Sequence, residues 1–150
     1  MNSELYPKIY LYQRIIRAKI FIDSNYGEKI DLENISDEAS FSKFHFIRLF
    51  KQIYGKSPHQ YLIITRIEKA KVLLQNGMNV SEVCYSVGFD SVSTFSGLFT
   101  KLVCKTPSNY SNHYKERKTK IKTTPAAFIP SCYSYMHGWM ENSNFEDENK

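Results

Sequence analysis

The sequence contains one segment twice, as Ser42–Tyr61 and again 49 positions later as Ser91–Tyr110. Seven residues are identical at equivalent positions of the two copies: Ser42 and Ser91, Phe46 and Phe95, Leu49 and Leu98, Phe50 and Phe99, Lys56 and Lys105, Pro58 and Pro107, Tyr61 and Tyr110. A solenoid needs about three or more such units to bury a continuous core, so two copies are too few for that architecture. The repeat therefore predicts two similar subdomains.

Each copy shows the periodicity of a helix that packs one face against a core. The predicted buried residues fall at i, i+3, i+4 and i+7: Phe46, Leu49, Phe50 and Ile53, then Phe95, Leu98, Phe99 and Leu102. The opposite faces carry Phe44, Ile47, Arg48 and Lys51 in the first copy, and Ser93, Ser96, Gly97 and Thr100 in the second. The first outward face thus carries basic side chains, and the second carries small, mostly polar ones.

A short helical pattern precedes each copy, with apolar residues at Ile30, Leu32, Ile35 and Ala39, and at Val80, Val83, Cys84 and Val87. Gly88 fits the tight turn of the second unit, and Ala39-Ser40 followed by the N-cap Ser42 fits that of the first. A short helix, a sharp turn and a second helix form a helix-turn-helix, whose second helix enters the major groove of DNA. The sequence predicts two of these motifs.

A long helix is predicted between the two units, because Ser57 is a suitable N-cap, Pro58 suits the first helical position and Gly77 suits the end. Its apolar residues are Tyr61, Leu62, Ile64, Ile67, Ala70, Val72, Leu73 and Leu74. At about 1.5 Å per residue, Pro58–Asn76 spans roughly 28 Å. A helix of this length would allow the two recognition helices, called the two readers below, to lie in successive major grooves, since one DNA turn is roughly 34 Å.

The predicted fold is all-α. The expected helices are Pro7–Asn25, Leu32–Ala39, Ser42–Tyr54, Pro58–Asn76, Val80–Val87, Ser91–Val103 and Pro107–Lys115. We expect one domain over residues 1–117, with a first unit at 7–56, a linker helix at 57–77 and a second unit at 78–115. In the first helix, Ile9, Ile16, Ile20 and Ile22 are expected to pack.

Residues 118–150 are expected to form a largely flexible tail, because Pro125, Pro130 and Gly138 interrupt it. The tail nevertheless holds several apolar residues: Phe128, Cys132, Tyr133, Tyr135, Met136 and Trp139. It either frays and partly covers the domain or binds a partner.

Positive charge is concentrated in the middle of the chain. The net charge is +5, and residues 43–71 hold seven basic residues against one acidic residue, Glu68. Such a cluster attracts phosphate and supplies salt-sensitive affinity for nucleic acid. A solvated helical face is the alternative for charge alone. Arg48 and Lys51 on one outward helical face favour DNA.

Neither an enzyme nor a metal or cofactor site is expected. The three cysteines, Cys84, Cys104 and Cys132, lack metal-ligand spacing and are expected to be reduced thiols, with Cys84 buried. His137 near Cys132 has no second ligand pair and no triad spacing. We see no apolar run of about 18 residues and no signal-peptide pattern, so a cytoplasmic protein without membrane contact is expected.

From about Tyr12 to Ser111 the chain resembles the DNA-binding domain of AraC/XylS-family transcriptional regulators. The resemblance rests on Ser42, His45, Phe46, Arg48, Leu49, Phe50, Lys51, Gly55, Ser57, Pro58 and Tyr61; Arg66, Ala70, Leu73 and Leu74; and Val87, Gly88, Phe89, Phe95, Ser96, Phe99, Lys101, Pro107 and Tyr110. It implies seven helices in two helix-turn-helix subdomains joined by a long helix, asymmetric promoter sites, and transcription activated through contacts with RNA polymerase.

The predicted DNA-binding residues are Ser42, Lys43, Phe44, Ile47, Arg48, Lys51, Ser91, Ser93, Ser96, Gly97, Lys101 and Lys105. Two of the residues here depart from the family pattern, which commonly has arginine at the place of Gly97 and glycine at the place of Cys104. Because Val92–Thr100 carries no basic residue, the second helix is expected to hold phosphate more than to read bases.

Two function classes stay open from the sequence. A sequence-specific regulator that binds double-stranded promoter DNA, without a separate effector domain and plausibly as a monomer, is favoured by the repeat and the Arg48 face. A protein-interaction module derived from the same fold, which tethers or sequesters another regulator, is favoured by the small second helix and the aromatic tail.

Overall fold

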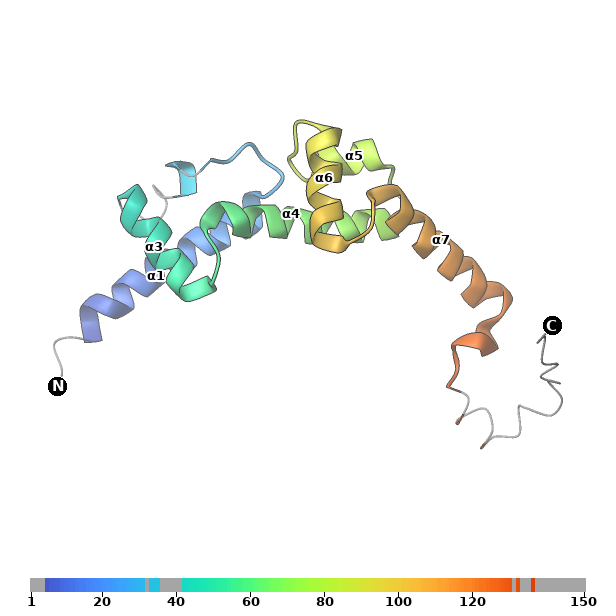
Figure 1. Ribbon diagram of the computed structural model, residues 1–150. Helices are drawn as coiled ribbons and strands as arrows, with labels where there is room; N and C mark the ends of the chain where they lie inside the picture. Colours follow the sequence, from blue (N-terminus) through green and yellow to red (C-terminus); the bar gives the residue numbers. More distant parts are fainter. Residues whose placement is uncertain (1–4, 32, 36–41, 131, 133–135, 137–150) are drawn as a thin grey trace. The chain divides into compact units, whose positions relative to one another are not determined.

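The structure is a computed structural model that describes residues 5–31, 33–35, 42–130, 132 and 136 (Figure 1). Its elements are α1 (Leu5–Asn25), α3 (Lys43–Tyr54), α4 (Pro58–Gln75), α5 (Val80–Ser86), α6 (Val92–Val103), α7 (Pro107–Thr123) and the 3₁₀-helix η1 (Pro125–Phe128). Residues 33–35 are also helical, and the rest of the predicted helix 32–39 lies outside the described residues. No strand occurs in the described ranges, so the all-α prediction is confirmed.

The predicted caps explain where α4 begins and ends. The Ser57 hydroxyl accepts a hydrogen bond from the Gln60 backbone N–H at 3.2 Å, while the Gln60 side chain accepts one from the Ser57 N–H at 3.0 Å. This capping box satisfies two backbone donors at the first turn. At the other end Gly77 has a φ of 91°, and the N–H groups of Gly77 and Met78 donate to Leu74 and Leu73. This Schellman arrangement uses the left-handed freedom of glycine.

The two helices that follow the turns are capped differently. At α6 the Ser91 hydroxyl accepts a hydrogen bond from the Thr94 N–H at 3.4 Å. Ser42 has the extended backbone of an N-cap at α3, but its side chain makes no capping hydrogen bond. The Ser42 hydroxyl is therefore not committed to the helix end, in contrast to that of Ser91.

Residues 1–111 form the first compact unit. Its first core joins α1, α3 and α4 through fully or nearly fully buried side chains: Ile15, Ala18, Ile22, Ile35, Phe46, Phe50 and Leu62. Full burial of each isoleucine, leucine or phenylalanine among them contributes about 1.5–3 kcal/mol to the free energy of folding. The predicted first helix-turn-helix thus packs on α1 as well as on α4.

The packing predicted for α1 is wrong at three of four positions. Ile22 is buried, but Ile9, Ile16 and Ile20 are 48%, 48% and 56% exposed. The buried face runs instead through Ile15, Ala18 and Ile22, at i, i+3 and i+7, and the other isoleucines lie on the opposite side of the helix. The helix is apolar on two sides, and hydrophobicity alone does not distinguish them.

A second group of buried residues surrounds α5 and α6. Aromatic rings follow one another from Phe89 to Phe95, Phe99 and Tyr110, with successive centroids 5.4, 5.7 and 5.5 Å apart. The Gln75 side chain donates to the Tyr110 hydroxyl at 2.7 Å, which ties the start of α7 to the end of α4. Phe46 and Phe50 make the equivalent ring contact in the first repeat, at 5.6 Å.

The outer ends of the predicted buried stripes are less buried than expected. Leu49 and Leu98 are half-buried, and Ile53 and Leu102 are 38% and 48% exposed. Both exposed residues are at i+7 of their stripe, one turn past the last buried phenylalanine.

Helix α7 runs to Thr123, well past the predicted end at Lys115. Residues 116–123 contain neither glycine nor proline, and Lys, Arg and Glu are good helix formers. Lys120 and Lys122 lie in the last turn, where cations interact favourably with the helix dipole. The next proline, Pro125, lies two residues beyond the observed end.

Residues 112–150 form the second compact unit, and the predicted division into 1–117 and 118–150 stays a prediction. Of the tail's apolar residues, Phe128 is 42% and Met136 81% exposed. Tyr133, Tyr135 and Trp139 lie outside the described residues. Among the described helices, none combines the length and apolar character that a membrane crossing requires.

Candidate nucleic-acid interface

The outward face of α3 carries a large apolar side chain beside basic ones. Phe44 is 87% exposed, and Arg48 and Lys51 are exposed one and two turns further along the same face. Ile47 is half-buried because it packs against the first core. The face therefore offers a ring, a planar guanidinium fork and an ammonium group in sequence.

Lys43 lies at the start of this helix and is partly neutralised. Its ammonium group is 3.1 Å from a carboxylate oxygen of Glu33, in an exposed ion pair. Exposed pairs of this kind are worth little, about 0–1 kcal/mol. A phosphate can therefore compete for Lys43 at small cost.

Gln52 is a candidate that the sequence reasoning missed. It is exposed and follows Arg48 by four residues, so both lie on one helical face. A glutamine amide can form a bidentate hydrogen-bond pair with adenine in the major groove. Its spacing of four residues from Arg48 is the sequence signal that could have found it.

The face of α6 carries short side chains. Ser93, Gly97 and Thr100 are exposed, and Ser96 is half-buried. The Thr100 hydroxyl donates to the Ser96 carbonyl at 2.7 Å, so part of its hydrogen-bonding capacity is used within the helix. A Cβ atom added at Gly97 would meet no heavy atom within 4 Å. The predicted phosphate ligands Lys101 and Lys105 are exposed at the end of this helix and just beyond it.

Both helices end in the same left-handed conformation, although the residues differ. Gly55 after α3 has a φ of 70°, and Cys104 after α6 has a φ of 59°. The N–H of each donates to a carbonyl four residues earlier, Lys51 and Thr100 respectively, at 2.9 Å. Cys104 is the one residue other than glycine with a positive φ in the described part of the chain. The repeat has thus kept the backbone geometry and lost the residue best suited to it.

Arg66 of α4 links the loop after α1, in the first helix-turn-helix unit, to Phe89 in the second. Its guanidinium donates to the carbonyls of Tyr26 at 2.7 Å and Glu28 at 2.8 Å. The guanidinium also lies over the ring of Phe89, 5.5 Å from its centroid. Burial lowers the pKa of Arg66, because desolvation disfavours its charged form.

Gly88 makes this contact possible. It has a φ of 88°, and an added Cβ would lie 2.8 Å from the Tyr26 carbonyl oxygen and 2.9 Å from a nitrogen of Arg66. The predicted turn role of Gly88 is therefore joined by a second one, close approach to the loop after α1. Sequence reasoning found only the first, because the loop lies about 60 residues earlier in the chain.

The basic cluster predicted from the sequence is divided among several tasks. Arg66 is half-buried and bonded to backbone carbonyls, and Lys71 pairs with Glu68 of the same helix at 2.8 Å. Arg48, Lys51 and Lys56 remain exposed around α3 and its end. The basic residues that can face DNA are thus concentrated on α3 and just after its end.

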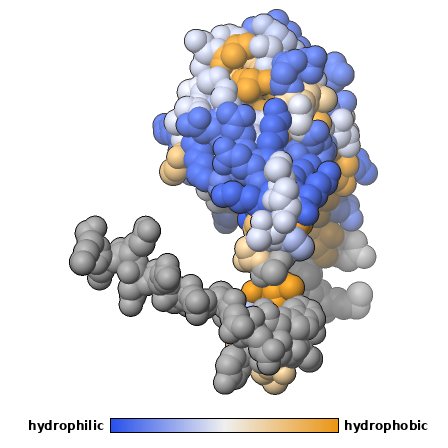
Figure 2. All heavy atoms as spheres, turned by 90° about the vertical axis from the view of Figure 1, so that its right-hand side faces the viewer, coloured by the Kyte–Doolittle hydropathy of each residue, from blue (hydrophilic) through white to orange (hydrophobic). Residues whose placement is uncertain are grey.

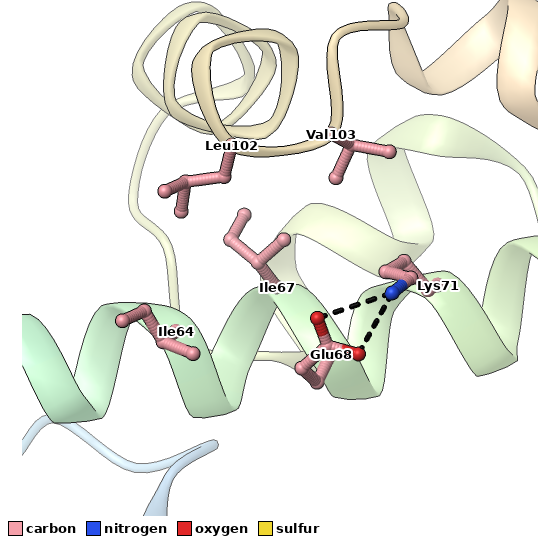
Figure 3. Close-up of a pocket in the computed structure, with 6 residues that line it drawn as sticks. All are labelled: Ile64, Ile67, Glu68, Lys71, Leu102 and Val103. Carbon is pink, nitrogen blue, oxygen red and sulfur yellow. Dashed lines mark hydrogen bonds and ion pairs between the residues drawn. The ribbon is translucent and has the colours of Figure 1, made fainter.

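An open depression lies between α4 and α6. It has a volume of about 420 Å³ and is lined by Ile64, Ile67, Glu68, Lys71, Leu102 and Val103, with the Glu68–Lys71 pair at one side (Figure 3). Its walls are mainly aliphatic, and its single ion pair is already satisfied. It offers no set of convergent polar groups of the kind that fixes a small ligand.

No group of three or more His, Cys, Asp or Glu side chains in the described ranges is arranged to hold a metal ion. Cys84 is buried in the second helix-turn-helix motif, as predicted, and burial raises the pKa of its thiol because desolvation disfavours the thiolate. Such a thiol is poorly reactive. Cys104 is exposed.

Comparison with known proteins gives a consistent result. A family model described as a helix-turn-helix domain matches residues 35–113, just over half of the chain. The uncharacterized HTH-type transcriptional regulator YdeC of Bacillus subtilis is 40% identical over 91 residues, which cover 60% of this chain and 31% of that protein. The lactose operon transcription activator of Staphylococcus xylosus is 30% identical over 119 residues, which cover 75% of this chain and 43% of that protein. The chain thus spans less than half the length of these relatives.

Solved structures show the same fold. The DNA-binding domain of AdpA, crystallised in complex with a target DNA, superposes with a TM-score of 0.68 and 27% identity, covering 71% of this chain and 96% of that one. An AraC-type regulator from Chromobacterium violaceum superposes with a TM-score of 0.63 and 24% identity, covering 75% of this chain and 96% of that one. The all-α fold of this chain is thus that of AraC-type DNA-binding domains.

Proposed function

Because the chain belongs to the AraC-type helix-turn-helix family, we propose that it is a sequence-specific transcriptional regulator that binds double-stranded promoter DNA. The observation that carries the proposal is the pairing of α3 and α6. These helices occupy equivalent positions of the repeat, bury their phenylalanine faces and expose the opposite faces. Two exposed helices of this kind are the elements that enter the major groove.

The first reader, α3, supplies most of the base recognition in this proposal. Arg48 forms a bidentate hydrogen-bond pair with a guanine edge, which is worth about 1–3 kcal/mol of discrimination. Phe44 and Ile47 contact thymine methyl groups, with Phe44 reaching further because of its exposure. Lys43 and Lys51 contact phosphates. The Ser42 hydroxyl, which is not used as a helix cap, donates a hydrogen bond to the DNA backbone.

The second reader, α6, mainly fixes the position of the duplex. Ser93, Ser96 and the open surface at Gly97 allow the helix to approach the DNA backbone closely. Lys101 and Lys105 contribute charge, and the Ser91 hydroxyl retains donor capacity while it accepts at the helix cap. None of these groups forms a long bidentate fork, so base discrimination by α6 is weak.

The connection between the readers suits one face of a duplex. Helix α4 has 18 residues, which correspond to about 27 Å, and a DNA turn is roughly 34 Å. The contacts of Arg66 with the loop after α1 make the linkage stiff. One chain supplies both readers, so a monomer suffices for an asymmetric site.

The same proposal covers the biological setting. A regulator of this kind acts in the bacterial cytoplasm, where promoter DNA lies, and activates transcription by contacting RNA polymerase. The S. xylosus relative is described as a transcription activator, which supports activation over repression. A segment outside this chain's match supplies the remaining length of such relatives.

A titration with fluorescently labelled DNA tests the proposal. The protein is titrated at about 50 and 200 mM salt against a duplex recovered by site selection and a shuffled duplex. We expect affinity for both to fall by about 10³-fold or more with salt, given six or more phosphate contacts, and the selected duplex to compete better than the shuffled one. Absence of DNA affinity at the lower salt would refute the function and leave the interaction-module alternative.

A further inference from the structure

Helix α1 has a second apolar face, which its core packing does not use. The residues of this face, Ile9, Tyr12, Ile16 and Ile20, are 48%, 45%, 48% and 56% exposed in that order. They follow one another at i, i+3, i+7 and i+11, which places all four within about 80° of the helix circumference. The buried residues of α1 lie on the opposite side. We call these four residues the α1 seam.

An aligned apolar face differs from the single apolar residues found on any protein surface. On the face that Figure 2 presents, hydrophilic residues cover most of the coloured surface. Isolated apolar residues are normal, whereas a contiguous apolar patch marks a surface that binds another molecule. The spacing of three and four residues along the α1 seam is the one by which two helices pack against each other. The seam therefore suits another helix.

The α1 seam is self-complementary in an antiparallel pair. In a twofold pair, residue i of one copy contacts residue j of the other, and j contacts i. When two α1 helices run in opposite directions, Ile9 lies opposite Ile20 of the second copy, and Tyr12 lies opposite the turn that contains Ile16. The seam is about 16 Å long, and each of its members then has an apolar neighbour. This direction also brings the positive end of each helix near the negative end of the other.

The charges beside the seam tolerate this arrangement. The Lys19 ammonium group lies 2.6 Å from the Asp23 carboxylate, so Lys19 is neutralised within its own helix. Arg17 is exposed, and the antiparallel register places it beside Gln13 of the second copy rather than beside its own equivalent. Helix α1 nevertheless holds four basic residues and one acidic residue, so two copies repel at long range. Added salt screens this repulsion and should strengthen the pair, the reverse of its effect on DNA binding.

The area of the seam fits a weak homodimer. A large aromatic side chain covers roughly 150–250 Å² and isoleucine somewhat less, so each half-exposed member leaves about 100 Å² open. The seam thus contributes about 400 Å² in each copy and about 800 Å² in a pair. The exposed Gln13 and Arg17 raise this toward about 1,000 Å², the lower limit of a specific interface. Such a pair forms only at high protein concentration.

Pairing through the seam leaves the first reader accessible. Ile15, Ala18 and Ile22, on the opposite side of α1, pack in the core with α3 and α4. Helix α3 turns Phe46 and Phe50 toward the same core and its Arg48 face away from it. The α1 seam and the outward face of α3 therefore lie on different sides of this core.

We propose that a second copy of this chain docks on the α1 seam and forms a weak antiparallel homodimer. The proposal goes beyond DNA binding and does not depend on it, because the pair forms without DNA.

Sedimentation velocity of the full chain without DNA, between about 20 µM and 1 mM, tests the proposal. Ile16→Gln/Ile20→Gln removes two apolar side chains from the seam. The matched control, Val72→Gln/Tyr85→Gln, removes two others that are 53% and 60% exposed on α4 and α5. Glutamine is at least as good a helix former as the residues it replaces. Circular dichroism and urea unfolding check that each variant is folded.

We expect the average mass of the parent and of the control variant to rise with concentration, and to rise further in about 0.5 M salt than in about 0.05 M salt. The seam variant should stay monomeric throughout. A parent that is monomeric at about 1 mM in both salts would overturn the proposal. So would a dimer that the seam variant retains, or one that both variants lose equally.

Disulfide cross-linking tests the direction of the pair, in a Cys104→Ser/Cys132→Ser background. In one chain, positions 9 and 20 are about 16 Å apart along the helix, too far for a disulfide, which needs Cα atoms within about 7 Å. Ile9→Cys/Ile20→Cys should therefore yield a covalent dimer on oxidation, and Ile20→Cys alone should yield none. A covalent dimer from the single variant, or none from the double variant, would overturn the antiparallel pairing. Neither result depends on DNA binding.

Discussion

The asymmetry of the two readers can be tested at a single position, Gly97. It occupies the place in α6 that Arg48 has in α3, and an added side chain there meets no heavy atom within 4 Å. Gly97→Arg should therefore stabilise the fold, because an interior glycine costs about 0.8–1.0 kcal/mol relative to alanine and arginine costs little. We expect a rise of about 0.5–1 kcal/mol in the free energy of unfolding, measured with urea.

The same variant should gain base recognition. A guanidinium projecting from this face can form a bidentate pair with guanine, worth about 1–3 kcal/mol at sites that place guanine opposite it. Gly97→Ala provides the stability gain without a polar group, and Gly97→Lys adds charge without the fork. Only the arginine variant should prefer a subset of sequences, whereas the lysine variant should tighten all sequences alike.

The binding assay is a titration of each variant against a panel of duplexes that differ only in the second half-site. If Gly97→Lys and Gly97→Arg change all duplexes equally, the exposed face of α6 does not meet base edges. If Gly97→Ala destabilises the protein, the open environment deduced for this position is wrong.

The remaining predictions concern the first reader and the turns. Arg48→Ala should cost about 1–3 kcal/mol on the preferred duplex and relax one base position, whereas Lys51→Ala should weaken all duplexes and flatten the salt slope by about 0.9; an unchanged preference in a folded Arg48→Ala protein contradicts the assignment. Cys104→Gly should raise the free energy of unfolding by about 0.5–1 kcal/mol, since a left-handed residue costs about 1–2 kcal/mol and glycine's added unfolded-state entropy offsets about 0.4–1. Gly55→Ala, at the equivalent turn, should lower the free energy of unfolding in the same urea experiment. If both substitutions change this free energy in the same direction, the two turns are not equivalent. Gly88→Ala should destabilise by about 2 kcal/mol or more, because its Cβ would collide with two carbonyl oxygens and Arg66; a thermal midpoint equal to the parent's would show that the turn relaxes freely.

Local chemistry made much of the fold predictable. Ser57, Pro58 and Gly77 mark the ends of α4 because caps and stops act within a few residues, and all three have the predicted roles. The buried phenylalanines of α3 and α6 follow from helical periodicity and from their repetition. These signals are carried by neighbours in the sequence, and no tertiary information is needed to read them.

Contacts between segments that are distant in the chain are harder to predict from the sequence. Ile16 and Ile20 were expected to pack, but α1 has two apolar sides and the position of α3 decides which is buried. Arg66 was counted with the surface charges, although its partners are backbone carbonyls about 40 residues earlier. Carbonyl groups carry no sequence signal, since every residue has one. The roles of the DNA-contacting residues remain predictions, because they depend on a partner molecule.

Selection from a pool of random duplexes tests the central claim most directly. The protein is incubated with the pool near 0.1 M salt, bound duplexes are amplified, and the enriched sequences are aligned after several rounds. The account predicts one sharply defined block of bases, with guanine opposite Arg48, and a degenerate block about one turn away. Two equally sharp blocks would show that α6 reads bases through its short side chains or through water. No enrichment of any sequence would contradict sequence-specific DNA binding altogether.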